Sequence, residues 1–131
     1  MGVEPFLISS TLEAVLGQRL LRSICRQCRA TYHPNDTLLG ELGLSRHDIG
    51  DKKFFYGKGC DACNNTGYKG RKGIYELLKI TDPLRELIND RAPTVTIKQK
   101  AIELGMVTLR QDGLRSIFAG DTTLEEVLRY T

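Results

Sequence analysis

The sequence has no apolar run of the roughly 20 residues that a membrane-spanning helix needs. It also lacks the charged start and apolar core of a secretory signal peptide. Hydrophobic residues make up 40% and charged residues 27% of its 131 positions, which is ordinary for a soluble globular protein. We therefore expect a cytoplasmic protein whose length suits one domain or a piece of one.

A Gly-x-x-x-x-Gly-Lys-Ser/Thr phosphate loop is absent, and no acidic strand end is present to hold magnesium. Residues 67–71 combine glycines with Lys69 and Arg71, but they lack the loop-to-helix context of a phosphate cradle. Their glycines fit turns better. No paired base and nucleophile indicates a separate enzyme. We predict no catalytic and no nucleotide-binding residues in this chain, which by itself is not expected to hydrolyse ATP.

The net charge is only +3, too small to indicate nucleic-acid binding by itself. Four arginines do lie close together, at Arg19, Arg22, Arg26 and Arg29. We interpret them as a solvated or interface face.

Four cysteines form the strongest pattern, because they occur as two Cys-x-x-Cys pairs, Cys25/Cys28 and Cys60/Cys63. Each pair can turn two thiolates toward one ion, and four thiolates complete a tetrahedral zinc site with no open position for water. The sequence therefore predicts a structural zinc site with these four ligands.

Other fates of the four thiols stay open. Two disulfides are possible, although a reducing cytoplasm disfavours them. An iron–sulfur cluster would use the same ligands, but its usual cysteine spacings are missing. The thiols could also be unligated. His33 and His47 lie between the pairs and could each replace a cysteine, although a surface position suits them better.

The N-terminal half predicts a helix, three strands and a small helix. Ile8, Leu12, Val15 and Leu16 fall on one helical face, with a capping-box pattern at residues 10–13. A strand at 18–24 leads into the first cysteine pair. Between the pairs we expect a short helix within 36–44 and a strand at 54–56. A turn-rich segment at 64–73 then leads to a strand at 74–80.

The C-terminal part predicts four helices in a small cluster. The first begins at Asp82-Pro83 and the second at Thr96, before Gly105. The third runs from about Leu109 to Gly120. The fourth follows a second capping-box pattern at residues 122–125. The expected fold class is therefore α+β, with a zinc-binding insertion at 25–63 and a helical subdomain at 81–131.

The order of short motifs resembles the secretion-superfamily ATPases of type II secretion and type IV pilus assembly. The resemblance covers nearly the whole chain. The motifs that carry it are Gly2-Val3-Glu4-Pro5, Gln18-Arg19-Leu20, both cysteine pairs, residues 66–71 and 73–78, Gly105-Met106, Thr108-Leu109-Arg110, Asp112-Gly113-Leu114 and residues 120–127.

The resemblance implies that residues 1–24 end a RecA-like ATPase core, that 25–63 are its tetracysteine insertion and that 64–80 return to its sheet. It also implies a homohexameric parent that binds ATP and magnesium outside this chain. That parent would act on an inner-membrane platform protein, and so associate with the membrane through partners. The insertion favours assembly or secretion over pilus retraction. The chain itself would be a structural and transmission element.

A zinc-ribbon adaptor or nucleic-acid-binding module is the alternative function. It requires basic and aromatic residues concentrated on the insertion. The insertion instead mixes acidic and basic residues in nearly equal number. We therefore expect no nucleic-acid partner.

Overall fold

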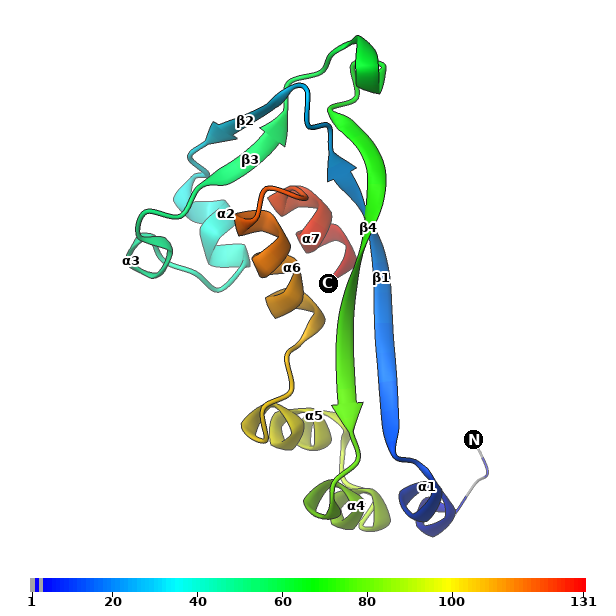
Figure 1. The fold of residues 1–131 in the computed structure, drawn as a ribbon. Coiled ribbons are helices and arrows are strands. Elements are labelled where there is room, and N and C mark those ends of the chain that lie inside the picture. The colour runs from blue at the N-terminus through cyan, green and yellow to red at the C-terminus, as the bar shows by residue number, and fades with distance from the viewer. Residues whose placement is uncertain (1, 3) are drawn as a thin grey trace. The chain divides into compact units, whose positions relative to one another are not determined.

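A computed structural model describes residue 2 and residues 4–131 (Figure 1). Met1 and Val3, which belong to the predicted segment 1–24 and to the Gly2-Val3-Glu4-Pro5 motif, lie outside the described residues. The chain is α+β, as predicted. Its elements are α1 (Pro5–Thr11), β1 (Ala14–Ile24), β2 (Arg29–Tyr32), α2 (Asp36–Glu41), α3 (Arg46–Ile49), β3 (Phe54–Gly57), a 3-10 turn η1 (Asp61–Cys63), β4 (Tyr68–Lys79), α4 (Asp82–Asn89), α5 (Thr94–Glu103), α6 (Leu109–Phe118) and α7 (Leu124–Tyr130).

The strands form two sheets, and each has two strands among the described residues. Strand β1 pairs with β4. Strand β2 pairs antiparallel with β3, so that Arg29 lies opposite Gly57 and Tyr32 opposite Phe54.

The chain divides into two compact units. Unit 1 is the described part of residues 1–18 together with residues 75–108, and unit 2 is residues 19–74 together with residues 109–131. Strands β1 and β4 contribute residues to both units. The four C-terminal helices divide between them, since α4 and α5 belong to unit 1 whereas α6 and α7 belong to unit 2.

Polar contacts join α1 and the segment after it to α4 in unit 1. The hydroxyl of Ser9 lies 2.6 Å from Oδ1 of Asn89, and the guanidinium of Arg85 donates to the carbonyls of Ser9 and Leu12. The main-chain N–H of Ile80 donates to Glu13 at 2.8 Å. The buried apolar residues of this unit are Ile80, Leu84 and Ala101.

Unit 2 has a continuous apolar core. Helices α6 and α7 and strands β1 and β4 pack there against residues from the segment between the cysteine pairs. Its buried members are Leu21, Leu39, Leu42, Ile49, Phe54, Ile74, Ile117, Leu124 and Val127. The rings of Phe54 and Phe118 meet edge to face, with centroids 5.4 Å apart. The insertion is therefore part of this core.

Two predictions for the N-terminal half were wrong in extent. The expected helix ends at Thr11, and Val15 and Leu16 lie in β1, which begins at Ala14. The pattern at residues 10–13 therefore falls at the end of a helix. Strand β4 begins at Tyr68, inside the segment predicted as turns, so Gly70 lies within a strand despite its φ of +87°.

Most other elements were predicted correctly. The short helix α2 lies within 36–44, and β3 begins at Phe54 as expected. Helix α4 has proline in its first turn, and α6 ends before Gly120, whose φ is +81°. Helix α5 begins at Thr94, two residues before the predicted start. The sequence analysis missed β2 and α3.

Candidate metal centre

The first cysteine pair follows β1 directly, as predicted. Cys25 is buried, and its main-chain N–H donates to the carbonyl of Gly67 at 2.9 Å. The N–H of Lys58 donates to the carbonyl of Cys28 at 3.0 Å. Both cysteines of the first pair are thus joined by main-chain hydrogen bonds to residues that flank the second pair.

The second pair brackets the turn η1, with Cys60 just before it and Cys63 as its last residue, and a left-handed segment follows. Asn64 and Asn65 have φ values of 54° and 61°, in the region that asparagine tolerates better than most residues. The N–H of Asn65 donates to Cys60 at 2.8 Å, which folds the chain back over the pair. The returning segment then passes to β4.

Two glycines, Gly57 and Gly67, allow the main chain before the second cysteine pair to lie against the main chain after it. A Cβ placed on Gly57 would overlap the main chain of Gly67, and one placed on Gly67 would overlap that of Gly57. Gly67 also has a φ of +80°. Any side chain at either position would push the two segments apart, and the two cysteine pairs with them.

The four sulfur atoms come together as predicted. All four lie within 4.8 Å of one another. Three of the six Sγ–Sγ distances are 3.7 Å for Cys25–Cys60, 3.8 Å for Cys28–Cys63 and 3.7 Å for Cys60–Cys63. A disulfide requires about 2.05 Å. A tetrahedron with zinc–sulfur bonds of about 2.3 Å has an edge of about 3.8 Å. The spacing fits a tetrahedral thiolate site and no disulfide.

Main-chain N–H groups donate to two of the sulfurs. Gly59 donates to Sγ of Cys28, while Cys60 and Gly67 donate to Sγ of Cys63, each at 3.3 Å. Such hydrogen bonds favour the charged form of a sulfur, which is the form that binds metal. The chain therefore provides partners for thiolates at this position.

The pKa values show how the cluster behaves without a cation. Burial tends to raise the pKa of Cys63, but the N–H groups of Cys60 and Gly67 and the neighbouring thiols lower it to about 6. Burial and the other thiols raise the pKa of Cys28 to about 11 and also raise that of Cys60. The lower pKa of Cys63 thus accompanies raised pKa values at Cys28 and Cys60. Adjacent thiolates repel one another, and a cation would relieve that repulsion.

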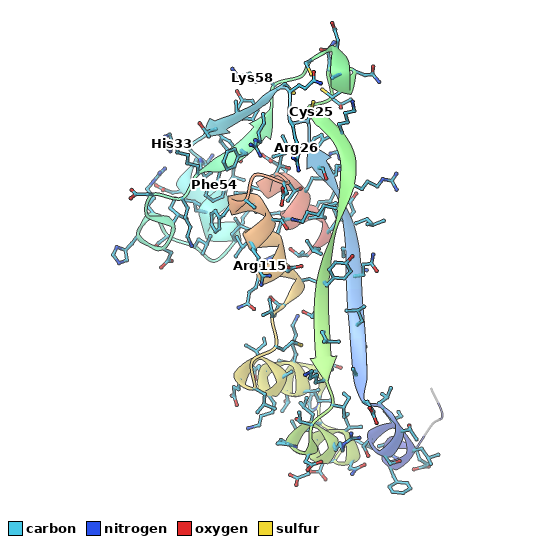
Figure 2. All side chains as sticks on the ribbon, viewed as in Figure 1. Cys25, Arg26, His33, Phe54, Lys58 and Arg115 are labelled. Atoms are coloured by element: carbon cyan, nitrogen blue, oxygen red, sulfur yellow. The ribbon has the colours of Figure 1, made fainter. Side chains whose placement is uncertain are left out.

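Neither histidine joins the cluster. The four cysteines form the metal-ligating group without His33 or His47, and both imidazoles are exposed. Figure 2 shows His33 beyond the outer end of β2, away from Cys25. The surface positions expected for these histidines agree with the structure.

The four arginines of the cluster are exposed, and two of them also contact α7 and the loop before it. The guanidinium of Arg22 pairs with Glu126 at 2.8 Å and lies 4.0 Å from the centre of the Tyr68 ring. Arg29 donates to the carbonyl of Gly120 at 3.2 Å. Both residues are nevertheless exposed, as the solvated-face interpretation predicted, so they combine a structural contact with a position at the surface.

Glu126 was missed in the sequence. Thr123 caps α7 by accepting from the N–H of Glu126, one residue later than the predicted box at 122–125. The carboxylate of Glu126 turns to Arg22. Burial favours the neutral acid, yet the side chain and main-chain N–H of Arg22 outweigh that effect and lower the pKa of Glu126. No local pattern in the sequence indicated this pair, because Arg22 and Glu126 are 104 residues apart.

A known protein family matches almost the whole chain. The family model described as type II/IV secretion system protein matches residues 1–129. The chain belongs to this family. Its resemblance to the secretion and pilus-assembly ATPases is thereby confirmed.

Relatives within the family carry two kinds of name. The type IV pilus assembly ATPase PilB of Thermus thermophilus is 47% identical over 131 residues, which are all of this chain and 15% of that protein. PilB of Myxococcus xanthus is 41% identical, and the type II secretion system protein E of Dickeya dadantii is 42% identical. Both alignments also include the whole chain, which covers 23% and 25% of these two relatives. The chain thus spans a quarter or less of the length of these three proteins.

None of the helices that the structure describes has both the length and the apolar character needed to cross a bilayer.

Proposed function

We propose that this chain is the C-terminal part of a homohexameric ATPase that powers type II secretion or type IV pilus assembly. Its family membership and the names of its relatives support this assignment. The relatives divide between the two machines at similar identity, so the proposal includes both. The nucleic-acid-binding alternative is not favoured by these comparisons.

We further propose that Cys25, Cys28, Cys60 and Cys63 bind one structural zinc ion. The observation that carries this proposal is the gathering of all four sulfurs within 4.8 Å, with three of the six spacings at 3.7–3.8 Å, the edge of a zinc–thiolate tetrahedron. Zinc would supply a cross-link between the end of β1 and the turn that leads into β4. With four protein ligands it would have no open position for catalysis.

The rest of the RecA-like domain lies, in this proposal, outside the chain. Isolated two-stranded ribbons are marginal in water, and β1 and β4 have no further partner strand among the described residues. Apolar side chains on both strands are also exposed, among them Val15, Leu16, Tyr75 and Leu77. Such side chains suit a sheet continued and covered by other parts of a larger protein.

The remaining roles belong to the whole protein. ATP and magnesium would bind outside this chain, which has no phosphate loop. The ring would lie in the cytoplasm and reach the inner membrane through a platform protein. The chain would support the ATPase domain and transmit its movement.

Metal analysis of the chain, purified without a metal-affinity step, tests the zinc site. We expect one zinc per chain and no reactive thiol until a chelator is added. Four free thiols without metal, or two disulfides, would contradict the site while leaving the family assignment intact.

The function is tested by Cys60→Ser in the full-length protein. We expect loss of secretion or piliation, because three thiolates hold zinc poorly and the insertion then loses its cross-link. Asp61→Asn is the matched control, since it changes an exposed neighbour in the same turn and keeps all four sulfurs. Normal assembly by a metal-free Cys60→Ser protein would overturn the proposal.

A further inference from the structure

A hollow in unit 2 lies beside the cysteine cluster. Two adjoining pockets of about 350 and 410 Å³ share four lining residues, Ser23, Ile24, Arg26 and Arg71. Cys25 lines one of them, and Asp121 lines the other. Volumes of this size are typical of sites for small molecules. The two pockets together are called the basic cleft below.

The basic cleft carries an excess of positive charge. Four cations line it, and only Lys72 pairs with the single carboxylate, that of Asp121. Within the part of the chain that the structure describes, Arg26, Lys69 and Arg71 make no ion pair and no side-chain hydrogen bond. Three cations without an acidic partner therefore face one concave surface.

Three arginines elsewhere in unit 2 have a carboxylate partner. Arg22 pairs with Glu126 and Arg46 with Asp36, while Arg115 lies 3.7 Å from Asp112. Arg26 and Arg71 in the cleft have no such carboxylate partner among the described residues. A concave surface lined by one sign of charge attracts counter-ions more strongly than a flat one.

The shape and chemistry of the cleft favour a compact anion. Gly70 lines it with a φ of +87°, and the position of a Cβ there has no atom within 4 Å, so a ligand can approach the main chain. Two guanidinium groups come from different segments, Arg26 from the turn after β1 and Arg71 from β4. Figure 2 shows Arg26 beside Cys25 at the end of β1. Guanidinium groups bind phosphoryl oxygens in pairs of parallel hydrogen bonds.

We propose that the basic cleft binds a phosphoryl group, with Arg26, Lys69 and Arg71 as its ligands. The group can come from a free phosphate compound or from the headgroup of an anionic lipid, since the recognised chemistry is the same. The site does not depend on the identity of the metal or on the ATPase assignment. It gives a role to the cations of residues 67–72, whose strand context rules out a phosphate loop there.

Titration of the isotope-labelled chain with inorganic phosphate tests the site. Amide resonances are followed at constant ionic strength, with chloride as the balancing anion. We expect saturable shifts confined to residues 23–27 and 69–72. Arg71→Gln and Arg26→Gln should each weaken binding about tenfold or more, because each removes hydrogen bonds between charged groups.

Arg115→Gln is the matched control, because it removes the same charge from an exposed arginine of unit 2 that does not line the cleft. Its phosphate affinity should change less than twofold. Equal weakening by Arg115→Gln, shifts that never saturate, or shifts that accompany loss of metal from the protein would overturn the proposal. Unchanged spectra away from each substituted site establish that the variants are folded.

A second arm identifies the source of the phosphoryl group. Sedimentation with vesicles that contain phosphatidylglycerol is compared with sedimentation with phosphatidylcholine vesicles. If the chain sediments only with vesicles that contain phosphatidylglycerol, and only when Arg71 is present, the ligand of the cleft is a lipid headgroup. Phosphate binding without vesicle binding assigns it to free phosphate compounds. Absence of both would overturn the proposal.

Discussion

Units 1 and 2 bury their apolar side chains to very different degrees. The core cluster of nine buried apolar residues lies entirely in unit 2, together with the four cysteines. Among the described residues of unit 1, only three apolar ones are buried, while Phe6 is 68% exposed, Leu16 59% and Val95 67%. Because apolar burial is the main source of folding free energy, unit 2 has the means to fold around its own core. Unit 1 has the surface expected of a part that packs against something else.

Metal removal should have the largest effect on stability, and this effect should fall on unit 2. We expect a chelator to unfold all of unit 2, because Leu39 and Phe54 of the insertion share one core with Ile117 and Leu124. Zinc binding is worth about 10–16 kcal/mol in small isolated modules, as much as the whole stability of many domains. Hydrogen exchange measured by mass spectrometry should show loss of protection over 109–131 as well as 25–63. Loss confined to 25–63 would mean that the insertion folds as a separate body.

Truncation of the Phe54 side chain should cause the next largest loss of stability. Phe54→Ala removes a fully buried ring that packs against Phe118 and should lower the free energy of unfolding by about 3–5 kcal/mol. Phe6→Ala makes the same chemical change on the exposed surface of unit 1 and should cost less than about 0.5 kcal/mol. Urea unfolding curves for the two variants measure the contrast directly. Similar losses would remove the distinction between the units.

Gly67→Ala tests the close contact that brings the cysteine pairs together. We expect a loss of about 3 kcal/mol, from strain at positive φ and from overlap with Gly57. Gly43→Ala is the control, since Gly43 has a similar φ of +74° but no atom within 4 Å of the added carbon. It should cost about 1 kcal/mol, the strain alone. Thermal unfolding of the metal-loaded proteins measures the difference, and equal losses would show that the main-chain contact is unimportant.

Glu126 should make unit 2 sensitive to acid. Its pKa is lowered in the folded state, so its contribution is complete above the unfolded value of about 4.3 and is lost as pH falls through the lower folded value. Glu126→Gln should cost about 2 kcal/mol at neutral pH, a moderate value because the Arg22 side chain is 48% exposed. It should also flatten the acid side of the curve of stability against pH.

Glu125→Gln is the control for that measurement, because Glu125 is the exposed neighbour of Glu126 on α7. It should leave the acid side of the curve unchanged. A curve for Glu126→Gln that parallels the unsubstituted protein below pH 4 would show that the Arg22 contact does not stabilise the carboxylate.

The features that the sequence predicted well depend on local signals. The spacing of the cysteines, the Asp82-Pro83 start of α4 and the cap at Thr123 are each encoded within a few residues. The same local signals misled where tertiary context decides. Val15 and Leu16 match a helical period, but they lie on a strand.

The features that the sequence did not predict join distant segments. Arg22 and Glu126 are 104 residues apart, and neither position carries a local sign of its partner. The packing of the insertion into a core with α6 and α7 is equally non-local. The basic cleft likewise combines cations from two segments of the chain. The sequence shows where these cations occur along the chain, but it does not show that they line one cleft.

A substitution on the exposed part of β1 in unit 1 should have the smallest effect on the stability of the chain. It also tests directly whether a larger ATPase domain covers this strand. Leu16→Ser should change the stability of the 131-residue chain by no more than about 0.5 kcal/mol, because Leu16 is already in water there. In the full-length protein the same substitution should cost about 2 kcal/mol, since the proposal buries this side chain within a completed sheet. Chemical unfolding of both proteins, with and without the substitution, gives the comparison. An equally small effect in the full-length protein would mean that the exposed face of β1 stays in water, and the proposed continuation of the sheet would have to be abandoned.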